Sequence, residues 1–300
     1  MFERLSRSWS LVKASASVLK QDKELLLFPL ISMGALVLVV ASFALPVFGL
    51  GILDGMSGGG DKAVSAGMYV VGFLFYLSQY FVIFFFNAAL VGAAMIRLDG
   101  GNPTLGDGMR IATSKIGAIA GYALIAATVG MILRAIQERV GFIGRIIVGL
   151  LGVAWTVATY LVVPVLVARD VGPIDAVKES TALLRKTWGE NVIGQVGIGA
   201  AFGFIFMAVI GCGFVLVAAS FMTHSIVLIV LALVVASLFT HSIPLLVVAL
   251  VATVLAVGIT GLVQSALTGI YAAALYRYAT TGESTQGFDS GALKLAFAPK

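Results

Sequence analysis

The sequence predicts an all-α integral membrane protein with six transmembrane helices, arranged as three hairpins that each follow a cytoplasmic-leaflet amphipathic helix. Hydrophobic residues make up 60% of the 300 residues and charged residues only 11%, whereas soluble domains carry about 25% charged residues. Apolar runs long enough to cross a bilayer recur along the chain, and short amphipathic segments stand before them. A soluble fold is therefore excluded.

The first amphipathic segment covers residues 4–24. Read as a helix, it places a stripe of mostly apolar side chains opposite a set of basic ones. The stripe consists of Leu5, Trp9, Val12, Ala16 and Leu19, and the basic residues are Arg4, Arg7, Lys13, Lys20 and Lys23. The apolar run that follows continues past any small-residue cleavage site. We therefore expect the first span to remain in the protein as a signal anchor.

Four spans follow as two hairpins, because a helix crosses a bilayer in about 20 residues. The first hairpin uses residues 25–53 and 68–98, joined by the glycine-rich turn GMSGGGDK. The second uses residues 116–136 and 141–168, joined by a tight turn. Pro164 lies late in the fourth span, where its missing backbone donor predicts a kink.

Two further amphipathic segments are predicted at residues 103–115 and 172–190. In the first, the stripe is Leu105, Met109, Ala112 and Ile116, and the residues off it are Asp107, Arg110 and Lys115. In the second, the stripe is Ile174, Val177, Thr181, Leu184 and Trp188, and the polar side carries Asp175, Lys178, Glu179, Arg185 and Lys186. The second segment leads into an apolar run from Val192, so we expect it to lie flat in the headgroup layer.

The first and last amphipathic segments match each other as an internal repeat. A shift of 165 positions pairs Val12 with Val177, Lys13 with Lys178, Ser15 with Ser180, Leu19 with Leu184, and Lys20 with Arg185. A match of this kind predicts a repeated structural unit, here an amphipathic helix followed by a hairpin.

The third hairpin runs from Val192 to about Tyr276 and contains more apolar chain than two spans need. The surplus lies between His224 and His241, just before Pro244. It is short for a full crossing, so a re-entrant segment, an interfacial segment and a seventh span are all open.

The distribution of Lys and Arg favours six spans. Six spans place fifteen of these residues on the side of the N-terminus and four on the other side, whereas seven spans change this to twelve against seven. The positive-inside rule therefore predicts that both termini are cytoplasmic. Residues 1–300 then form a single membrane domain, with spans between residues 25 and 278 and a cytoplasmic tail at 279–300.

A family resemblance is carried by three stretches of the sequence. They are LSRSWSLVKASASVLKQDKELLLFPLIS at the start, FFFNAALVGAAM in the second span, and ALYRYATTGESTQGFD near the end. Together they are similar to an uncharacterised family of bacterial multi-pass membrane proteins, a domain of unknown function. The resemblance covers most of the chain and implies a bacterial inner (cytoplasmic) membrane protein, but it brings no activity and no site.

The segment AVKESTALLRKTW is similar, more distantly, to the membrane domains attached to some glycerophosphodiester phosphodiesterases. The soluble catalytic barrel of those enzymes is absent from this sequence. The resemblance therefore implies a shared membrane segment and no shared activity.

The supply of catalytic side chains is small. Two histidines, one cysteine and fourteen carboxylates are spread along the chain, and no HExxH, P-loop or CxxC motif is present. No carboxylate lies deep within a predicted span, as intramembrane catalysis would need. We expect no enzyme activity, no cofactor and no nucleic-acid partner. His224 and His241 are candidates for a metal-binding pair, although a histidine at the end of a membrane segment more simply reaches water.

Four amide side chains lie within predicted spans: Gln79, Asn87, Gln195 and Gln264. Hydrocarbon offers an amide no partner, so each should hydrogen-bond another helix or line a watery permeation route. Arg134 and Glu138 stand four residues apart at the outer end of the third span and are expected to pair. The arginines at other span ends are expected to reach the headgroups, and they are Arg97, Arg145, Arg169 and Arg277.

The predicted function is that of a non-enzymatic scaffold or lipid-interacting assembly protein that works through its basic cytoplasmic face. Such a face should prefer anionic lipid. The residues expected at the lipid surface are Lys13, Lys20, Lys178, Arg185, Lys186, Trp9 and Trp188. Gly199 and Gly203 form a GxxxG pair that suits close packing within one chain or between chains, so a homo-oligomer is also expected. The alternative is a channel or carrier whose pathway, between hairpins or subunits, is lined by the four amides.

Overall fold

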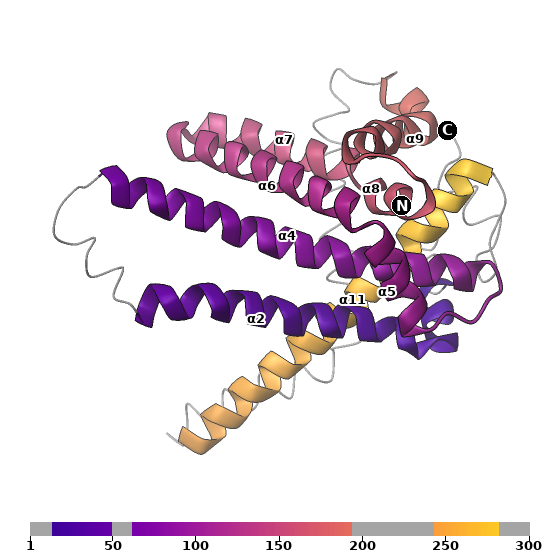
Figure 1. The fold of residues 1–300 in the computed structure, drawn as a ribbon, viewed down its shortest axis with the longest axis horizontal. Helices are drawn as coiled ribbons and strands as arrows, with labels where there is room; N and C mark the ends of the chain where they lie inside the picture. Colours follow the sequence, from indigo (N-terminus) through magenta and orange to yellow (C-terminus); the bar gives the residue numbers. More distant parts are fainter. Residues whose placement is uncertain (1–13, 50–61, 194–242, 282–300) are drawn as a thin grey trace. The chain divides into compact units, whose positions relative to one another are not determined.

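The computed structural model describes residues 14–49, 62–193 and 243–281, and within these ranges the chain is helical with no strand. A helix over residues 14–21 comes first. The elements that follow are η1 (Lys23–Leu26), α2 (Leu27–Gly49), α4 (Lys62–Leu98), α5 (Leu105–Ser114), α6 (Ile116–Arg139), α7 (Phe142–Ala158), α8 (Val162–Ala168), α9 (Pro173–Ile193) and α11 (Ile243–Thr281) (Figure 1). The predicted all-helical class is confirmed for this part of the chain.

Within the described ranges, five helical stretches are long and apolar enough to cross a membrane. They are Lys23–Leu45, Val70–Leu98, Ile116–Arg139, Phe142–Ala168 and Gly258–Thr281. The first four coincide closely with the first four predicted spans, and the fifth with the last one. Most of the remaining predicted span lies in residues 194–242, outside the described residues, together with the short apolar piece between the two histidines.

Two compact units divide the chain. The first contains Met1–Thr187 and Ala266–Ala298, and the second contains Trp188–Ser265 and Pro299–Lys300. The helix α11 therefore contributes its C-terminal part to the first unit. The packing and the polar contacts described below belong to the first unit.

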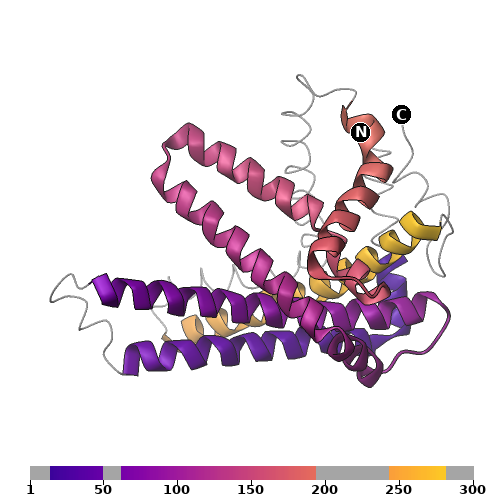
Figure 2. The same ribbon diagram turned by 45° about the horizontal axis from the view of Figure 1, so that its top comes forward.

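The helix α4 is the centre of the first unit, because it packs against α2, α5, α6 and α8. Figures 1 and 2 show α2 lying beside α4 and α7 lying beside α6. Residues 88–94 of α4, with the sequence AALVGAA, are completely buried. Small side chains let helix backbones approach closely. This stretch of α4 therefore has the composition that contact with several helices requires.

The helix α5 packs very closely against the first two spans. A Cβ atom added to Gly108 of α5 would lie 2.4 Å from Cζ of Phe28 and 2.6 Å from the carbonyl oxygen of Ala89. One helical turn later, Ala112 is also completely buried. The face of α5 that meets α4 therefore combines small residues with Ile111, whose side chain would lie 2.9 Å from a Cβ on Gly92.

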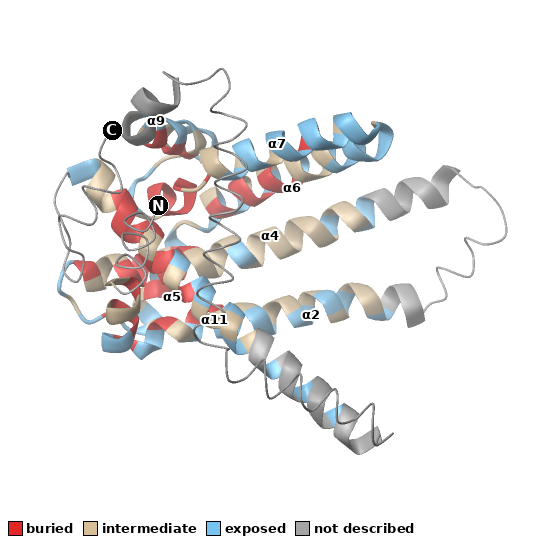
Figure 3. Ribbon diagram, turned by 180° about the vertical axis from the view of Figure 1, so that it is seen from behind, coloured by how far each residue is buried: buried red, intermediate tan, exposed pale blue. Residues whose placement is uncertain are grey.

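Exposure is highest on the helices that lie away from this centre. Buried residues concentrate in α8 and in residues 88–94, whereas much of α7 is exposed (Figure 3). Phe142 and Ile143, at the start of α7, are 79% and 74% exposed. Large apolar side chains on an outer face suit contact with lipid tails, as the membrane class requires.

The fourth span is broken rather than kinked. Its two helices, α7 and α8, are separated by a turn at residues 159–161, and Pro164 is the third residue of α8. Proline has no backbone N–H and cannot donate to the carbonyl of Tyr160. In the first turn of a new helix this missing donor costs nothing, because the first N–H groups of a helix have no partner within it. The disturbance predicted from Pro164 therefore lies in the expected part of the span, but the helix is interrupted there and not only bent.

Candidate functional site

Charged side chains from several elements are joined by ion pairs and hydrogen bonds into what we name the polar platform: residues 14–24, 97–115 and 169–187 with Arg277. An ion pair joins Asp99, just after α4, to Arg277 of α11. Lys115, between α5 and α6, pairs with Asp170 at 3.0 Å and donates to the carbonyl oxygen of Arg169 at 3.1 Å. The two connections between spans on this side are thereby fixed to each other and to α11.

A turn that contains Gly100 and Gly101 ends α4 within the polar platform. The N–H of Gly101 donates to the carbonyl of Ile96, and that of Gly100 to the carbonyl of Arg97, which is the Schellman arrangement. Gly100 has a φ of 84°, a conformation in which a side chain would be strained. The Arg97 guanidinium closes the turn by donating to the Gly101 carbonyl at 3.1 Å. The turn directs the chain into α5.

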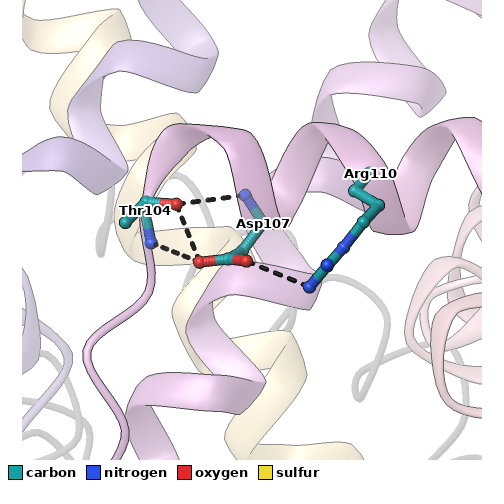
Figure 4. Close-up of polar contacts among 3 residues, drawn as sticks. All are labelled: Thr104, Asp107 and Arg110. Atoms are coloured by element: carbon teal, nitrogen blue, oxygen red, sulfur yellow. Dashed lines mark hydrogen bonds and ion pairs between the residues drawn. The ribbon is translucent and has the colours of Figure 1, made fainter.

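The start of α5 is held by a capping box (Figure 4). The Asp107 N–H donates to the Thr104 hydroxyl at 3.2 Å, and the Thr104 N–H donates to the Asp107 carboxylate at 3.0 Å. Arg110 pairs with the same carboxylate at 3.1 Å. The hydrogen bond from the Thr104 side chain is the main cause that lowers the pKa of Asp107, with the Thr104 N–H and Arg110 acting in the same direction. The sequence TLGD contains the signal for this cap, which is a threonine followed three residues later by an acid. Apolar periodicity alone does not reveal such a signal.

A second carboxylate ties the first helical segment to α5. Glu24 accepts a hydrogen bond from the N–H of Leu105, the first residue of α5, at 3.2 Å. An anion at a helix N-terminus is favoured by the unpaired N–H groups and the helix dipole. The segment before the first span is therefore attached to the segment before the third.

The face that α9 buries differs from the predicted stripe. Ala176 and Ser180 are completely buried and Leu184 is 5% exposed, so the buried face repeats every four residues. Ile174 of the predicted stripe is 59% exposed, and Thr181 is exposed as well. The stripe was predicted to face the headgroup layer, so the exposure of these two residues does not contradict it. Apolar periodicity did not reveal the separate face that packs on protein, because it does not distinguish contact with protein from contact with lipid. Small side chains allow the close approach that packing on the spans requires.

The burial pattern agrees with the internal repeat. Ser15 and Ser180 are 2% and 0% exposed, and the leucines four residues later are 8% and 5% exposed. Lys20 and Arg185, which follow those leucines directly, are both exposed. The helix over residues 14–21 and α9 therefore place equivalent residues in equivalent environments.

Three exposed cations of the polar platform carry no ion pair among the described residues: Lys20, Lys23 and Arg185. Other described cations of the platform are paired, since Lys178 pairs with Asp175 at 3.1 Å and Arg169 with Glu179 at 2.8 Å. The Glu179 carboxylate accepts a hydrogen bond that raises the pKa of Arg169, which keeps this side chain charged. The remaining residues predicted at the lipid surface, Lys13, Lys186, Trp9 and Trp188, have side chains outside the described set.

A buried carboxyl lies between the helix over residues 14–21 and η1. Asp22 is 6% exposed, and among the described residues neither its Oδ2 atom nor the buried Nε of Arg97 has a hydrogen-bond partner. Burial raises the pKa of Asp22, and the positive charge of Arg97 opposes this in part. Glu24 adds a smaller rise. The proximity of Asp22 and Arg97 could not be predicted from the sequence, because the two residues are far apart along the chain.

A buried hydroxyl joins α9 to the break in the fourth span. Ser180 Oγ donates to the carbonyl oxygen of Ala158 at 2.7 Å and accepts from the N–H of Leu161 at 3.1 Å. These two backbone groups flank the turn between α7 and α8. The internal repeat aligns Ser180 with Ser15 in the sequence, but only the folded chain shows which groups the Ser180 hydroxyl bonds to.

The amides predicted within spans fall at separate places. Asn87 lies in α4 with its Oδ1 atom 3.5 Å from the position that a Cβ on Gly269 of α11 would take. Gln79 is partly exposed in α4, and Gln264 is exposed in α11. Gln195 lies outside the described residues, as do His224 and His241. Within the described ranges, no group of three or more His, Cys, Asp or Glu side chains is arranged to hold a metal ion.

The arginine predictions divide into two groups. Arg134 pairs with Glu138 at 3.1 Å, as predicted, and also donates to the hydroxyl of Tyr76. Arg145 is exposed, as a side chain reaching for headgroups requires. The other three are bonded to protein, and they are Arg97, Arg169 and Arg277. For these three, contact with headgroups stays a prediction, and within the described residues their partners are oxygen atoms of the loop after α4 and of α9.

The comparisons with known proteins give a family and no activity. No curated protein and no solved structure matches the chain. A family of unknown function, DUF6159, matches residues 65–222 and again residues 210–288. These overlapping segments cover well over half of the chain, as the resemblance in the sequence implied. The chain therefore belongs to this family of unknown function, DUF6159.

Proposed function

We propose that the protein is a non-enzymatic scaffold of the bacterial inner membrane whose polar platform binds anionic lipid. The observation that carries the proposal is the set of exposed cations without an ion pair among the described residues: Lys20, Lys23 and Arg185. A cation near a headgroup layer contributes about 1 kcal/mol to attraction by anionic lipid. A cation that already faces a carboxylate contributes less.

The proposal includes an arrangement of the chain in the membrane. Six spans form three hairpins, each preceded by an amphipathic helix, and both termini lie in the cytoplasm. The polar platform then faces the cytoplasmic leaflet, where anionic lipids are attracted to basic segments. The similarity to membrane domains of glycerophosphodiester phosphodiesterases is taken as one of membrane architecture. A homo-oligomer fits a scaffold, because a repeated copy multiplies the lipid-binding surface.

The test compares lipid selectivity between variants of the full chain in vesicles of phosphatidylcholine and phosphatidylglycerol. Lys20→Gln combined with Arg185→Gln removes one unpaired cation from each copy of the repeat. We expect the association of spin-labelled phosphatidylglycerol to fall about fivefold for each cation removed, which corresponds to about 1 kcal/mol each.

Lys178→Gln combined with Asp175→Asn is the matched control, because it removes an ion pair from the same helix as Arg185 without changing the net charge. It should leave the selectivity nearly unchanged. Unchanged selectivity in the double variant, or an equal loss in the control, would show that the unpaired cations do not bind lipid.

The second candidate function is a channel or carrier, and the break in the fourth span favours it. Discontinuous spans occur in transporters, where freed backbone groups face a binding site. Asn87 places an amide between α4 and α11 and is the described residue best placed to line a pathway. Solute flux through reconstituted vesicles tests this: flux that changes with Asn87→Leu would support a pathway, and absence of flux above empty vesicles would argue against one.

A further inference from the structure

The turn between α7 and α8 leaves backbone groups that a continuous helix would have paired. The N–H of Tyr160 bonds to Val157 and that of Val162 to Thr159, so the chain tightens at this point. The carbonyl of Ala158 and the N–H of Leu161 receive no backbone partner in this scheme. Inside a membrane span, where water is scarce, an unpaired backbone group costs several kcal/mol.

The hydroxyl of Ser180 satisfies both of these groups at once. It donates to the Ala158 carbonyl at 2.7 Å and accepts from the Leu161 N–H at 3.1 Å. Ser180 is completely buried and Leu161 is 1% exposed, so water does not compete at this place. Thr181, the next residue, bonds mainly to its own helix, at 2.8 Å from the Val177 carbonyl, and lies 3.5 Å from the Ala158 carbonyl.

Two further contacts hold α9 in the same position. Pro173, its first residue, lies so close to α6 that a Cβ on Gly121 would be 2.8 Å from the proline Cγ. Glu179 pairs with Arg169, which directly follows α8, at 2.8 Å. Ser180 therefore stands on a helix whose start and middle are both fixed to the spans.

The geometry points to a conformational latch: the Ser180 hydroxyl couples α9 to the break in the fourth span, so that the turn at residues 159–161 opens only when α9 lifts from the spans. The two elements then move as one unit. The Ala158 carbonyl and the Leu161 N–H are hydrogen-bonded by a side chain of another element, because no backbone group of the fourth span bonds to them. A surface helix is in this way connected to the interior of a span.

Hydrogen exchange of the full chain tests the latch, with vesicles of neutral lipid so that the outcome does not depend on lipid binding. Two peptides are followed, one covering the turn and one covering residues 174–186 of α9. Ser180→Ala should accelerate exchange roughly tenfold in both peptides, because it leaves a buried donor and acceptor unpaired. Thr181→Ala is the matched control and should change neither peptide by more than about twofold.

The latch would be overturned if Ser180→Ala accelerates only the turn, only α9, or neither peptide. Ser180→Cys provides a second variant of nearly the same shape, in case the alanine variant does not fold. Its thiol is a weak donor, so both peptides should accelerate together by a smaller factor. A thiol variant that changes one peptide without the other would contradict the coupling as well.

Discussion

Asp22 shows how one buried residue can make the attachment of a helix depend on pH. Its carboxyl is 6% exposed, and the raised pKa means that the folded chain favours the protonated form. A buried carboxyl is destabilised by ionisation unless a partner compensates. The positive charge of Arg97 lowers the pKa of Asp22, but the two side chains form no ion pair within the described residues.

The sign of the pH dependence follows from linkage. Because the folded pKa lies above the unfolded value, the folded state binds the proton more tightly. The attachment of the helix over residues 14–21 should strengthen as the pH falls through the raised pKa of Asp22 in the folded chain. Below the pKa that Asp22 has in the unfolded chain, it should strengthen no further. Amide protection of residues 18–25, corrected for intrinsic exchange, should therefore increase between about pH 7 and about pH 4.

Asp22→Asn imitates the protonated form, so it should raise this protection at neutral pH and remove its pH dependence. Asp175→Asn changes an exposed carboxylate on α9 and serves as the control, with no effect on residues 18–25. Protection that decreases on acidification of the wild-type chain would contradict the assignment.

At the scale of the helix, α5 and α9 attach to the spans through small residues. Gly108 and Ala112 form the buried face of α5, and Ala176 and Ser180 that of α9. In both cases larger apolar residues of the predicted stripe are partly or fully exposed, as Met109 is in α5 and Ile174 is in α9, the latter at 59%. One apolar helix face thus divides into a part for protein and a part for lipid.

Gly108→Ala tests this close approach. The new methyl group would meet the ring of Phe28 and the backbone oxygen of Ala89, and the oxygen cannot move away easily. We expect a loss of about 1–3 kcal/mol in the free energy of unfolding, as for other overpacked sites. Denaturant titration in detergent micelles measures it.

Gly106→Ala in the same helix is the control. A Cβ at residue 106 would meet only the Thr104 hydroxyl, at 3.7 Å. Alanine is a better helix former than glycine, so this variant should be stabilised by about 0.5–1 kcal/mol. Equal effects of the two substitutions would show that α5 does not pack as described.

For the whole molecule, the polar platform explains how segments far apart in the sequence are kept together. Asp99 with Arg277, Lys115 with Asp170, and Glu24 with Leu105 each join two different connections or spans. The apolar helices extend from this connected region and expose their outer faces. Exposed pairs contribute little to stability one by one, but several that share one region restrict its geometry.

Topology is the property of the whole molecule that most needs a measurement. In a Cys212→Ser background, Lys178→Cys should react with a membrane-impermeant thiol reagent only from the cytoplasmic side. Arg139→Cys, at the end of α6, should react only from the periplasmic side. Labelling of residue 178 in intact cells would overturn the proposed orientation and, with it, the assignment of the platform to the cytoplasmic leaflet.

The sequence by itself determined the elements that depend on local properties. The predicted boundaries of the first four spans agree with the described apolar stretches within about three residues, except that the first stretch ends at Leu45 and not at residue 53. The agreement follows because hydropathy and length are local quantities. Pro164 marked the disturbed span, and the shift of 165 residues aligned Ser15 with Ser180, although it did not predict that both are buried. The pair of Arg134 and Glu138 was predicted because its residues are four apart on one helix.

Only the tertiary structure decided which faces meet protein and which partners the polar groups take. The charge that acts on Asp22 and the hydrogen-bond partners of Ser180 belong to other elements of the chain, and no spacing in the sequence encodes these contacts. The buried face of α9 was likewise decided by fit, because Ala176 can approach a span more closely than Ile174. In a membrane, apolar side chains are favourable on either side of a helix, so hydrophobicity identifies the helix and the shapes of its neighbours select its contacts.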